Sequence, residues 1–318
     1  MTAVVPGHAA APAPAPAVPT VRTRRREWLA ALATAARTPR GAIGLTLAGL
    51  IIAVAVIGPY LAPHGIAEIV GPDLAKPSAH FPLGTDYLGR DVLSRVLEGG
   101  WVLLIMAAAA TVIGVSLGAT AGISAAYLRG AADGAIMRTV DVILAFPQLV
   151  FALLLLSILG PRLWLITLAV GITHAPQVGR VIRAATLDVS EQDYVKAVEL
   201  QGMRPAKVMT KEILPNLVTP LMVEIGLRLT YSIIIIAGLA FLGFGQNPPA
   251  SSWGELINDN RAYLAVNPWA VIAPAVLIAL LTIGVNTYSD AIARVAIGVD
   301  RRPEEAALLD DLGPREAA

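Results

Sequence analysis

The sequence has no cysteine, few charged residues and almost no net charge. Only 15% of its 318 residues are charged, whereas a soluble domain has about 25%. The absence of cysteine excludes disulfides, thiolate metal sites, iron–sulfur clusters and cysteine nucleophiles. A net charge of +1 gives no basic field of the kind that favours nucleic acid. This composition excludes an ordinary cytosolic enzyme, and we expect no nucleic-acid partner.

Sequence motifs for nucleotide binding and for catalysis are scarce as well. The dipeptide Gly-Lys does not occur, so no phosphate-binding loop can be proposed. We predict no catalytic residues, no metal ligands and no cofactor bound by this chain.

The first 40 residues are predicted to form an arm that does not span the membrane. Residues 1–20 are rich in Ala and Pro, a composition typical of disorder. Four arginines and Trp28 follow, which predicts a basic cytoplasmic arm with a possible interfacial helix. A twin-arginine export signal is the alternative, but Arg37 and Arg40 interrupt it before the apolar run begins.

Hydrophobic residues make up 56% of the sequence, and they gather in six long runs. About 20 apolar residues span a bilayer, so we predict an all-α, polytopic membrane protein with six transmembrane helices in a domain over 41–298. Residues 299–318 form a predicted cytoplasmic tail. The expected spans are 41–62, 101–127, 139–160, 163–185, 218–245 and 268–293.

Positive charge predicts the orientation of these spans. With the N-terminus in the cytoplasm, eighteen Lys and Arg fall in cytoplasmic segments and five in outer segments. Because basic residues are enriched on the cytoplasmic side, both termini are predicted to be cytoplasmic. The outer segments are then 63–100, a short turn near 161, and 246–267, where Trp253 and Trp269 are expected to anchor at the membrane interface.

Several polar residues lie inside the apolar runs. Pro147 and Pro176 are expected to kink their helices. Polar side chains at this depth face a cavity or a partner rather than lipid, so they are candidates for lining a solute path. A helix-to-helix hydrogen bond is the alternative for His174. The candidates are Gln148, His174, Gln177 and Asn286.

Charges within the spans occur at helical spacing. Glu224 and Arg228 are four residues apart, as are Asp290 and Arg294, so each pair can form an ion pair on one helix face. We interpret them as structural pairs near the cytoplasmic ends. A secondary transporter would place charge at mid-bilayer and show internal repeats, and an intramembrane hydrolase would pair His174 with a second catalytic motif; both are remote alternatives.

Small residues recur every fourth position in the second run and predict a helix-packing stripe. Its partner, in this chain or another, is left open. The stripe consists of Ala110, Gly114, Gly118, Gly122 and Ala126.

The internal loop over 191–216 predicts a helix, a turn and a second helix. Gly202 permits a sharp turn, Pro205 can start the next helix, and Pro215 precedes the fifth span. Without catalytic residues, this unit is typical of a docking element. Its apolar positions at helical spacing are Tyr194, Val195, Val198 and Met203.

This loop resembles the coupling loop of ABC-importer permeases, the EAA motif, although Val198 replaces its second alanine. The matching residues are Tyr194, Val195, Ala197, Gly202, Ile213, Leu214, Pro215 and Asn216. Residues 82–95 (PLGTDYLGRDVLSR), the segment 239–254, and Asn286 with Asp290 resemble further blocks of the C-type permease of dipeptide, oligopeptide and nickel importers. From the residues alone, 82–95 reads as a turn and a charged cap before the second span.

The resemblance implies a type I ABC importer permease that forms half of a translocation pathway. It implies as partners a second homologous permease, two ABC ATPase subunits that bind ATP and Mg, an extracytoplasmic solute-binding protein and membrane lipid. Peptides are the expected solute; a nickel chelate, haem or another solute of the same family is the alternative. Coupling to the ATPases is then expected from Tyr194, Val195, Ala197, Val198, Gly202, Met203 and Pro215.

Overall fold

The computed structural model describes residues 32–245 and 252–297, and within this part the protein is built of helices. Residues 1–31 and 298–318, in which most of the predicted arm and the tail fall, lie outside the described residues. The long helices are α2 (Pro39–Leu61), α4 (Gly100–Leu128), α5 (Gly130–Leu144), α6 (Gln148–Leu159), α7 (Leu163–Ser190), α10 (Val218–Leu239) and α12 (Trp269–Ile297). The short ones are α3 (Val92–Glu98), α8 (Asp193–Leu200), α9 (Pro205–Lys207) and α11 (Trp253–Asn260).

Five stretches are long and apolar enough to cross a membrane, and a bent pair of helices makes a sixth if it is one span. The single stretches are Pro39–Leu61, Val92–Leu128, Leu163–Ser190, Val218–Phe244 and Trp269–Val295. The span expected over 139–160 corresponds to this bent pair, and the kink expected at Pro147 is confirmed. Helices α5 and α6 meet at an angle of 81°, because Pro147, which cannot continue the α5 hydrogen-bond ladder, precedes the first turn of α6. At Pro176, in contrast, α7 continues without a break.

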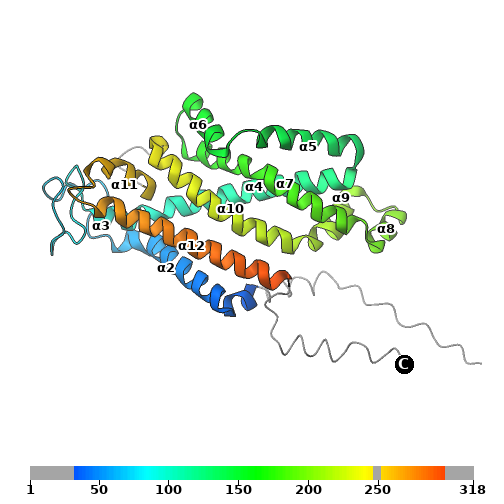
Figure 1. Ribbon diagram of the computed structural model, residues 1–318, viewed down its shortest axis with the longest axis horizontal. Coiled ribbons are helices and arrows are strands. Elements are labelled where there is room, and N and C mark those ends of the chain that lie inside the picture. The colour runs from blue at the N-terminus through cyan, green and yellow to red at the C-terminus, as the bar shows by residue number, and fades with distance from the viewer. Residues whose placement is uncertain (1–31, 246–251, 298–318) are drawn as a thin grey trace, which may run out of the picture.

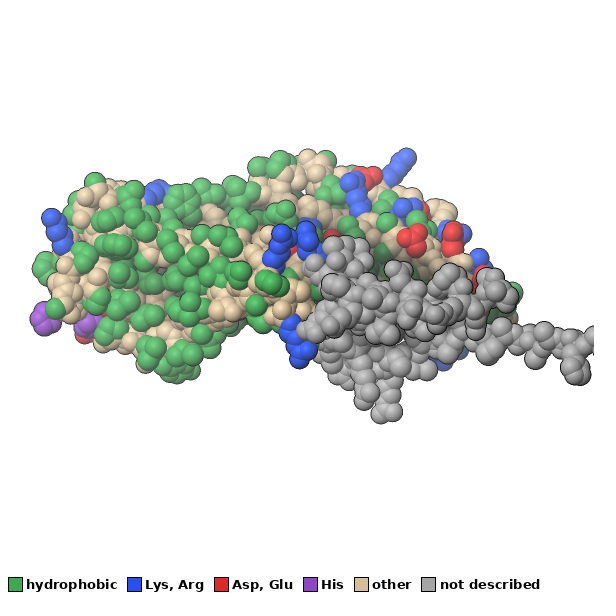
Figure 2. Space-filling view, turned by 60° about the horizontal axis from the view of Figure 1, so that its bottom comes forward, with side chains coloured by type: hydrophobic (Ala, Val, Ile, Leu, Met, Phe, Trp, Pro, Cys, Tyr) green, Lys and Arg blue, Asp and Glu red, His purple; other side chains and the backbone are tan. Residues whose placement is uncertain are grey.

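The long helices form an elongated bundle (Figure 1), with α3 and α11 at one end and α8 and α9 at the other. Its middle carries a hydrophobic surface, and most of the charged side chains in view gather toward the end that carries α8 (Figure 2). This distribution fits a bundle whose middle lies in lipid.

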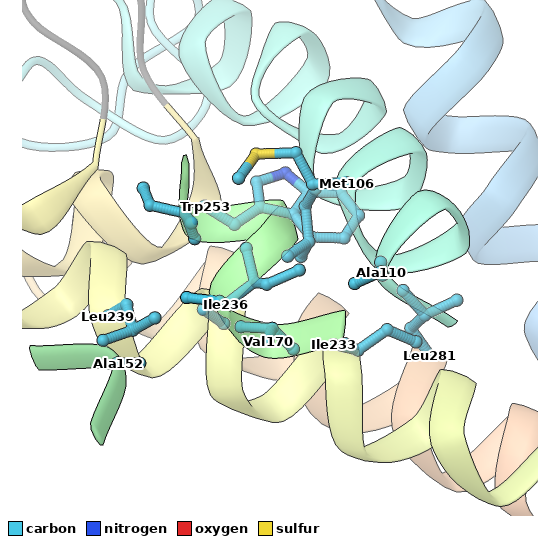
Figure 3. Close-up of a cluster of buried hydrophobic side chains, with 14 of the residues drawn as sticks. Met106, Ala110, Ala152, Val170, Ile233, Ile236, Leu239, Trp253 and Leu281 are labelled. Atoms are coloured by element: carbon cyan, nitrogen blue, oxygen red, sulfur yellow. The ribbon is translucent and has the colours of Figure 1, made fainter. Parts of the chain in front are cut away.

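The interior is packed by apolar side chains from most of the long helices. Figure 3 shows Met106, Ala110, Ile233 and Leu281 in this core, together with Trp253, whose side chain is fully buried. The expectation that Trp253 anchors at the membrane interface is therefore wrong. Its Nε1 donates to the carbonyl of Val96 at 2.7 Å, so the indole joins α11 to α3.

The small-residue stripe of α4 packs against α7 of the same chain. A Cβ at Gly118 would lie 2.5 Å from the Ala175 carbonyl oxygen, and one at Gly122 would lie 2.6 Å from that of Gly179. Both distances are shorter than real Cβ contacts allow, so only glycine permits this approach. The open question of the stripe's partner is answered: it is α7.

Candidate functional site

The end of the bundle opposite α11 carries the segment that the sequence singled out for coupling. Helix α8 follows the end of α7. After α8, Gly202 turns the chain with φ of +79°, a left-handed conformation that glycine adopts without strain. Pro205 then occupies the first turn of α9. A π-helical turn (Val208–Ile213) and a 3-10 turn (Leu214–Asn216) lead into α10.

Helix α8 has a buried side and an exposed side. Val195 is fully buried in a cluster with Val208, Ile213 and Ile182, so it fastens α8 to its own chain. Ala197 is exposed, and Leu200 is 90% exposed. The exposed side of α8 therefore presents apolar side chains to the surroundings of the described chain. Sequence reasoning missed Leu200, although it lies three residues after Ala197 and so shares its helix face.

Three further coupling candidates are neither as buried as Val195 nor as exposed as Ala197. Tyr194, Val198 and Met203 are half-buried against the cluster that holds Val195. Pro215 lies in the 3-10 turn before α10. The segment is thus a short helix on an apolar base.

Three of the four pathway candidates lie close together. The amide Nε2 of Gln148, at the start of α6, donates to the carbonyl of Thr173 on α7 at 3.0 Å. One turn further along α7, Gln177 accepts a hydrogen bond from Arg228 of α10. Asn286 lies on α12, where it is half-buried.

His174 is fully buried rather than open to a path. Its Nε2 lies 3.0 Å from the hydroxyl of Ser232, which is 3.3 Å from that of Thr111. These bonds join α7, α10 and α4, as the helix-to-helix alternative requires.

A Gly-x-Ser-x-Gly string occurs at 114–118, and it does not form a hydrolase site. It lies inside helix α4, whereas the nucleophile of such enzymes needs a strand-to-helix turn. His174 bonds Ser232 rather than Ser116. Among the described residues, no group of three or more His, Asp or Glu side chains could hold a metal ion.

The charge pairs differ from each other. Arg228 Nε donates to Glu224 Oε2 at 3.1 Å, and both side chains are buried. The expected pair of Asp290 and Arg294 is not formed: within the described part of the chain neither makes an ion pair, and both are exposed, so water solvates them instead.

The segment 82–95 builds a cap at the end opposite α8. Asp86 is fully buried and accepts from Arg90 Nε at 2.7 Å and from Arg95 Nη1 at 2.6 Å. Asp91 begins α3 by accepting from the backbone N–H of Ser94 at 3.1 Å. Asn267 binds the carbonyls of Leu83 and Thr85, which joins the two segments expected on the outer side.

A buried carboxyl group lies beside this cap. Glu255 is 6% exposed and accepts from the backbone N–H of Ser252 in the capping box that begins α11. Burial raises the pKa of Glu255 to about 7, and the nearby Asp259 adds to that effect, whereas the bond from Ser252 opposes it. The carboxyl therefore changes charge near neutral pH.

The sequence is similar to those of known transport proteins. Residues 114–296 match the family described as "Binding-protein-dependent transport system inner membrane component". The dipeptide transport system permease protein of Alkalihalophilus pseudofirmus is 31% identical, with 83% of this chain and 87% of that protein covered. The di/tripeptide transport system permease protein of Pseudomonas aeruginosa is 34% identical over 79% and 86%, and the glutathione transport system permease protein of Pectobacterium atrosepticum is 33% identical over 76% and 81%.

A solved structure shares the fold. An inward-facing structure of the MetNI methionine ABC transporter matches with a TM-score of 0.52 and 18% identity, covering 64% of this chain and 96% of the other. The matching residues 114–296 contain α8, the Gly202 turn, the broken helix and the Glu224–Arg228 pair. The chain is therefore a multi-pass membrane protein that belongs to the family of binding-protein-dependent transport system inner membrane components.

Proposed function

We propose that this chain is one of two permease subunits of an ABC importer that carries di- and oligopeptides across the cell membrane. The printed names of its relatives support peptides as the solute. The observation that carries the proposal is helix α8: it ends in an exposed Leu200 beside Ala197, while its inner side is fixed by Val195. A helix held in this way can pass a displacement by a bound partner to the helices of the bundle.

The partners follow from this arrangement. Two ATPase subunits, which bind ATP and Mg, contact α8 on the cytoplasmic side. A second permease completes the translocation path, and an extracytoplasmic solute-binding protein delivers the solute at the end that carries α3 and α11. This chain itself is non-catalytic and binds no cofactor.

Coupling works through movement of α8. When the ATPases close, they move α8. The π-helical turn after α8 passes this displacement to α10, because α8 and α10 both pack on the apolar cluster that contains Val208 and Ile213 of that turn. The spans then change from inward-open to outward-open, an alternating-access change. π-turns of this kind are frequent at functional sites.

Two substitutions test the coupling. Ala197→Glu places a charge on the exposed side of α8. Gly202→Val strains a left-handed backbone by about 1–3 kcal/mol, although a Cβ there would meet no neighbour. Both variants should enter the membrane normally, lose ATPase co-purification and lose ATP-driven uptake. Normal uptake with bound ATPase in both would overturn the coupling role of 191–216.

Uptake of labelled dipeptide tests the solute. Proteoliposomes that contain this chain, its partner permease, the ATPases and the binding protein should accumulate peptide only with ATP. Uptake of nickel chelate or haem in place of peptide would replace the proposed solute, and uptake without the ATPases would indicate a secondary transporter.

A further inference from the structure

The break between α5 and α6 exposes irregular backbone within an apolar stretch. Ala145, Phe146 and Pro147 are all exposed, with Phe146 at 51%. In the hydrocarbon region, backbone groups without helical partners cannot face lipid. This side of the bundle therefore faces water or another protein chain.

Polar groups extend from the break to α10. Gln148 follows the break directly and donates to the Thr173 carbonyl. Gln177 lies one turn from Thr173 and accepts from Arg228. The buried Arg228 is thus connected to the exposed break through Gln177, one turn of α7 and Gln148.

Arg228 has hydrogen-bonding capacity that the chain does not use. It is 7% exposed, and it bonds through Nε to Glu224 and through Nη1 to Gln177. Its Nη2 makes no hydrogen bond to any described residue, and the side chain is 8% exposed. The guanidinium carbon lies 5.4 Å from the ring centre of Tyr231, which is 48% exposed on the same helix.

A second, partly exposed ion pair of the chain uses its guanidinium differently. Arg183 binds Asp133 through Nε at 2.7 Å and Nη2 at 2.6 Å, so both carboxylate oxygens are used. Arg228 makes only one contact with Glu224. Charged groups in membrane spans are costly and mark functional positions, and a buried ion pair is weak evidence for stability.

We propose that Arg228 is a binding residue for the terminal carboxylate of the peptide in transit, a site that rests on the proposed function. The free Nη2 donates to the carboxylate, while Glu224 holds the guanidinium in place and balances its charge when the site is empty. Gln177 fixes the second nitrogen, and Tyr231 covers the guanidinium face. Arginine suits this role because it binds carboxylates by charge-assisted hydrogen bonds.

The test compares Ala-Ala-Ala with its C-terminal amide in proteoliposomes of the complete transporter, at concentrations that give equal wild-type rates. The variant is Glu224→Gln with Arg228→Gln, which removes both charges and leaves neither buried alone. Uptake of the free acid should fall at least about tenfold, the loss expected for a charged hydrogen bond, and uptake of the amide should stay within about twofold. Dividing each rate by the wild-type rate removes the preference of the binding protein.

Two further variants separate binding from structure. Asp133→Asn with Arg183→Gln removes the other ion pair and should affect both peptides alike. Arg228→Lys keeps a cation beside Glu224, and it should lower uptake of the free acid severalfold without changing the amide.

The outcomes are distinct. Equal losses for acid and amide, or no loss for either, in the double-glutamine variant or in Arg228→Lys would overturn the carboxylate site and leave the importer function intact. Absence of uptake of both peptides by an assembled wild-type transporter would overturn the proposed function and the site with it.

Discussion

At the scale of single residues, buried charge is concentrated in the segment 82–95, which reaches the distant α11 through one ion pair. Asp86 sits between Arg90 and Arg95, and Arg95 also reaches Asp259 at 3.3 Å. Removing one member of such a cluster leaves its partners buried and unpaired. This costs more stability than removing one member of an exposed ion pair. The motif 82–95 therefore acts as a structural cap that fixes α3 to α11.

Glu255 gives this region a dependence on pH. Its folded-state pKa of about 7 lies above the ordinary 4.5, so its contribution to stability is full below pH 4.5 and is lost as pH rises through about 7. Glu255→Gln should keep the capping box and stabilise the protein at pH 8.5, by on the order of 3 kcal/mol. The gain should vanish near pH 4.5.

Thermal unfolding of the detergent-solubilised protein at several pH values measures this effect. Glu68→Gln, at an exposed position, is the matched control and should change the unfolding midpoint little at any pH. A gain for Glu255→Gln that is larger at low pH than at high pH would contradict the assignment.

At the scale of helices, the contact of α4 with α7 depends on glycine. Gly118→Val would place a Cβ 2.5 Å from the Ala175 carbonyl oxygen, and backbone cannot yield as a flexible side chain can. We expect a loss of about 1–3 kcal/mol, the usual cost of overpacking a tight interface. The thermal midpoint and the yield of folded protein measure it.

Gly134→Ala is the control for this prediction. Gly134 lies in α5 with no atom within 4 Å of an added Cβ, and alanine favours helix by about 1 kcal/mol. This variant should be as stable as the wild type or slightly more so. Equal stability of Gly118→Val would show that the two helices can separate without cost.

Leu200 tests the docking role of α8. Because its side chain is 90% exposed, Leu200→Glu should not change the stability of the isolated chain. It should weaken ATPase co-purification and lower ATP-driven uptake by at least about tenfold. The neighbouring exposed Glu199→Gln should leave both unchanged. Normal co-purification and uptake with Leu200→Glu, or an equal loss for both substitutions, would mean that the Leu200 side chain is not what α8 docks through.

At the scale of the whole molecule, the positions of the long helices follow from hydrophobic run length. A run such as 163–185 has no other way to satisfy its backbone in lipid than as a helix, and α7 indeed covers it. The left-handed turn after α8 also follows from local chemistry, because Gly202 and Pro205 each restrict the backbone at their own positions.

Other features depend on contacts between distant residues, which the sequence pattern does not contain. The angle of 81° at the α5–α6 break involves α7, through the bond from Gln148 to Thr173. The burial of Trp253 depends on Val96, 157 residues earlier. Leu200 was missed because apolar periodicity marks the buried side of a short helix more readily than its exposed one.

The orientation of the bundle in the membrane can be read from the labelling of single cysteines. With the α8 end in the cytoplasm, residue 79 lies outside and residue 196 inside, and both positions are exposed. Because the chain has no cysteine, Ala79→Cys and Lys196→Cys each introduce a single thiol. A membrane-impermeant maleimide added to intact cells should label position 79 alone, and permeabilised cells should show both. Labelling of position 196 in intact cells would reverse the orientation and separate α8 from the ATPases, since these bind ATP in the cytoplasm.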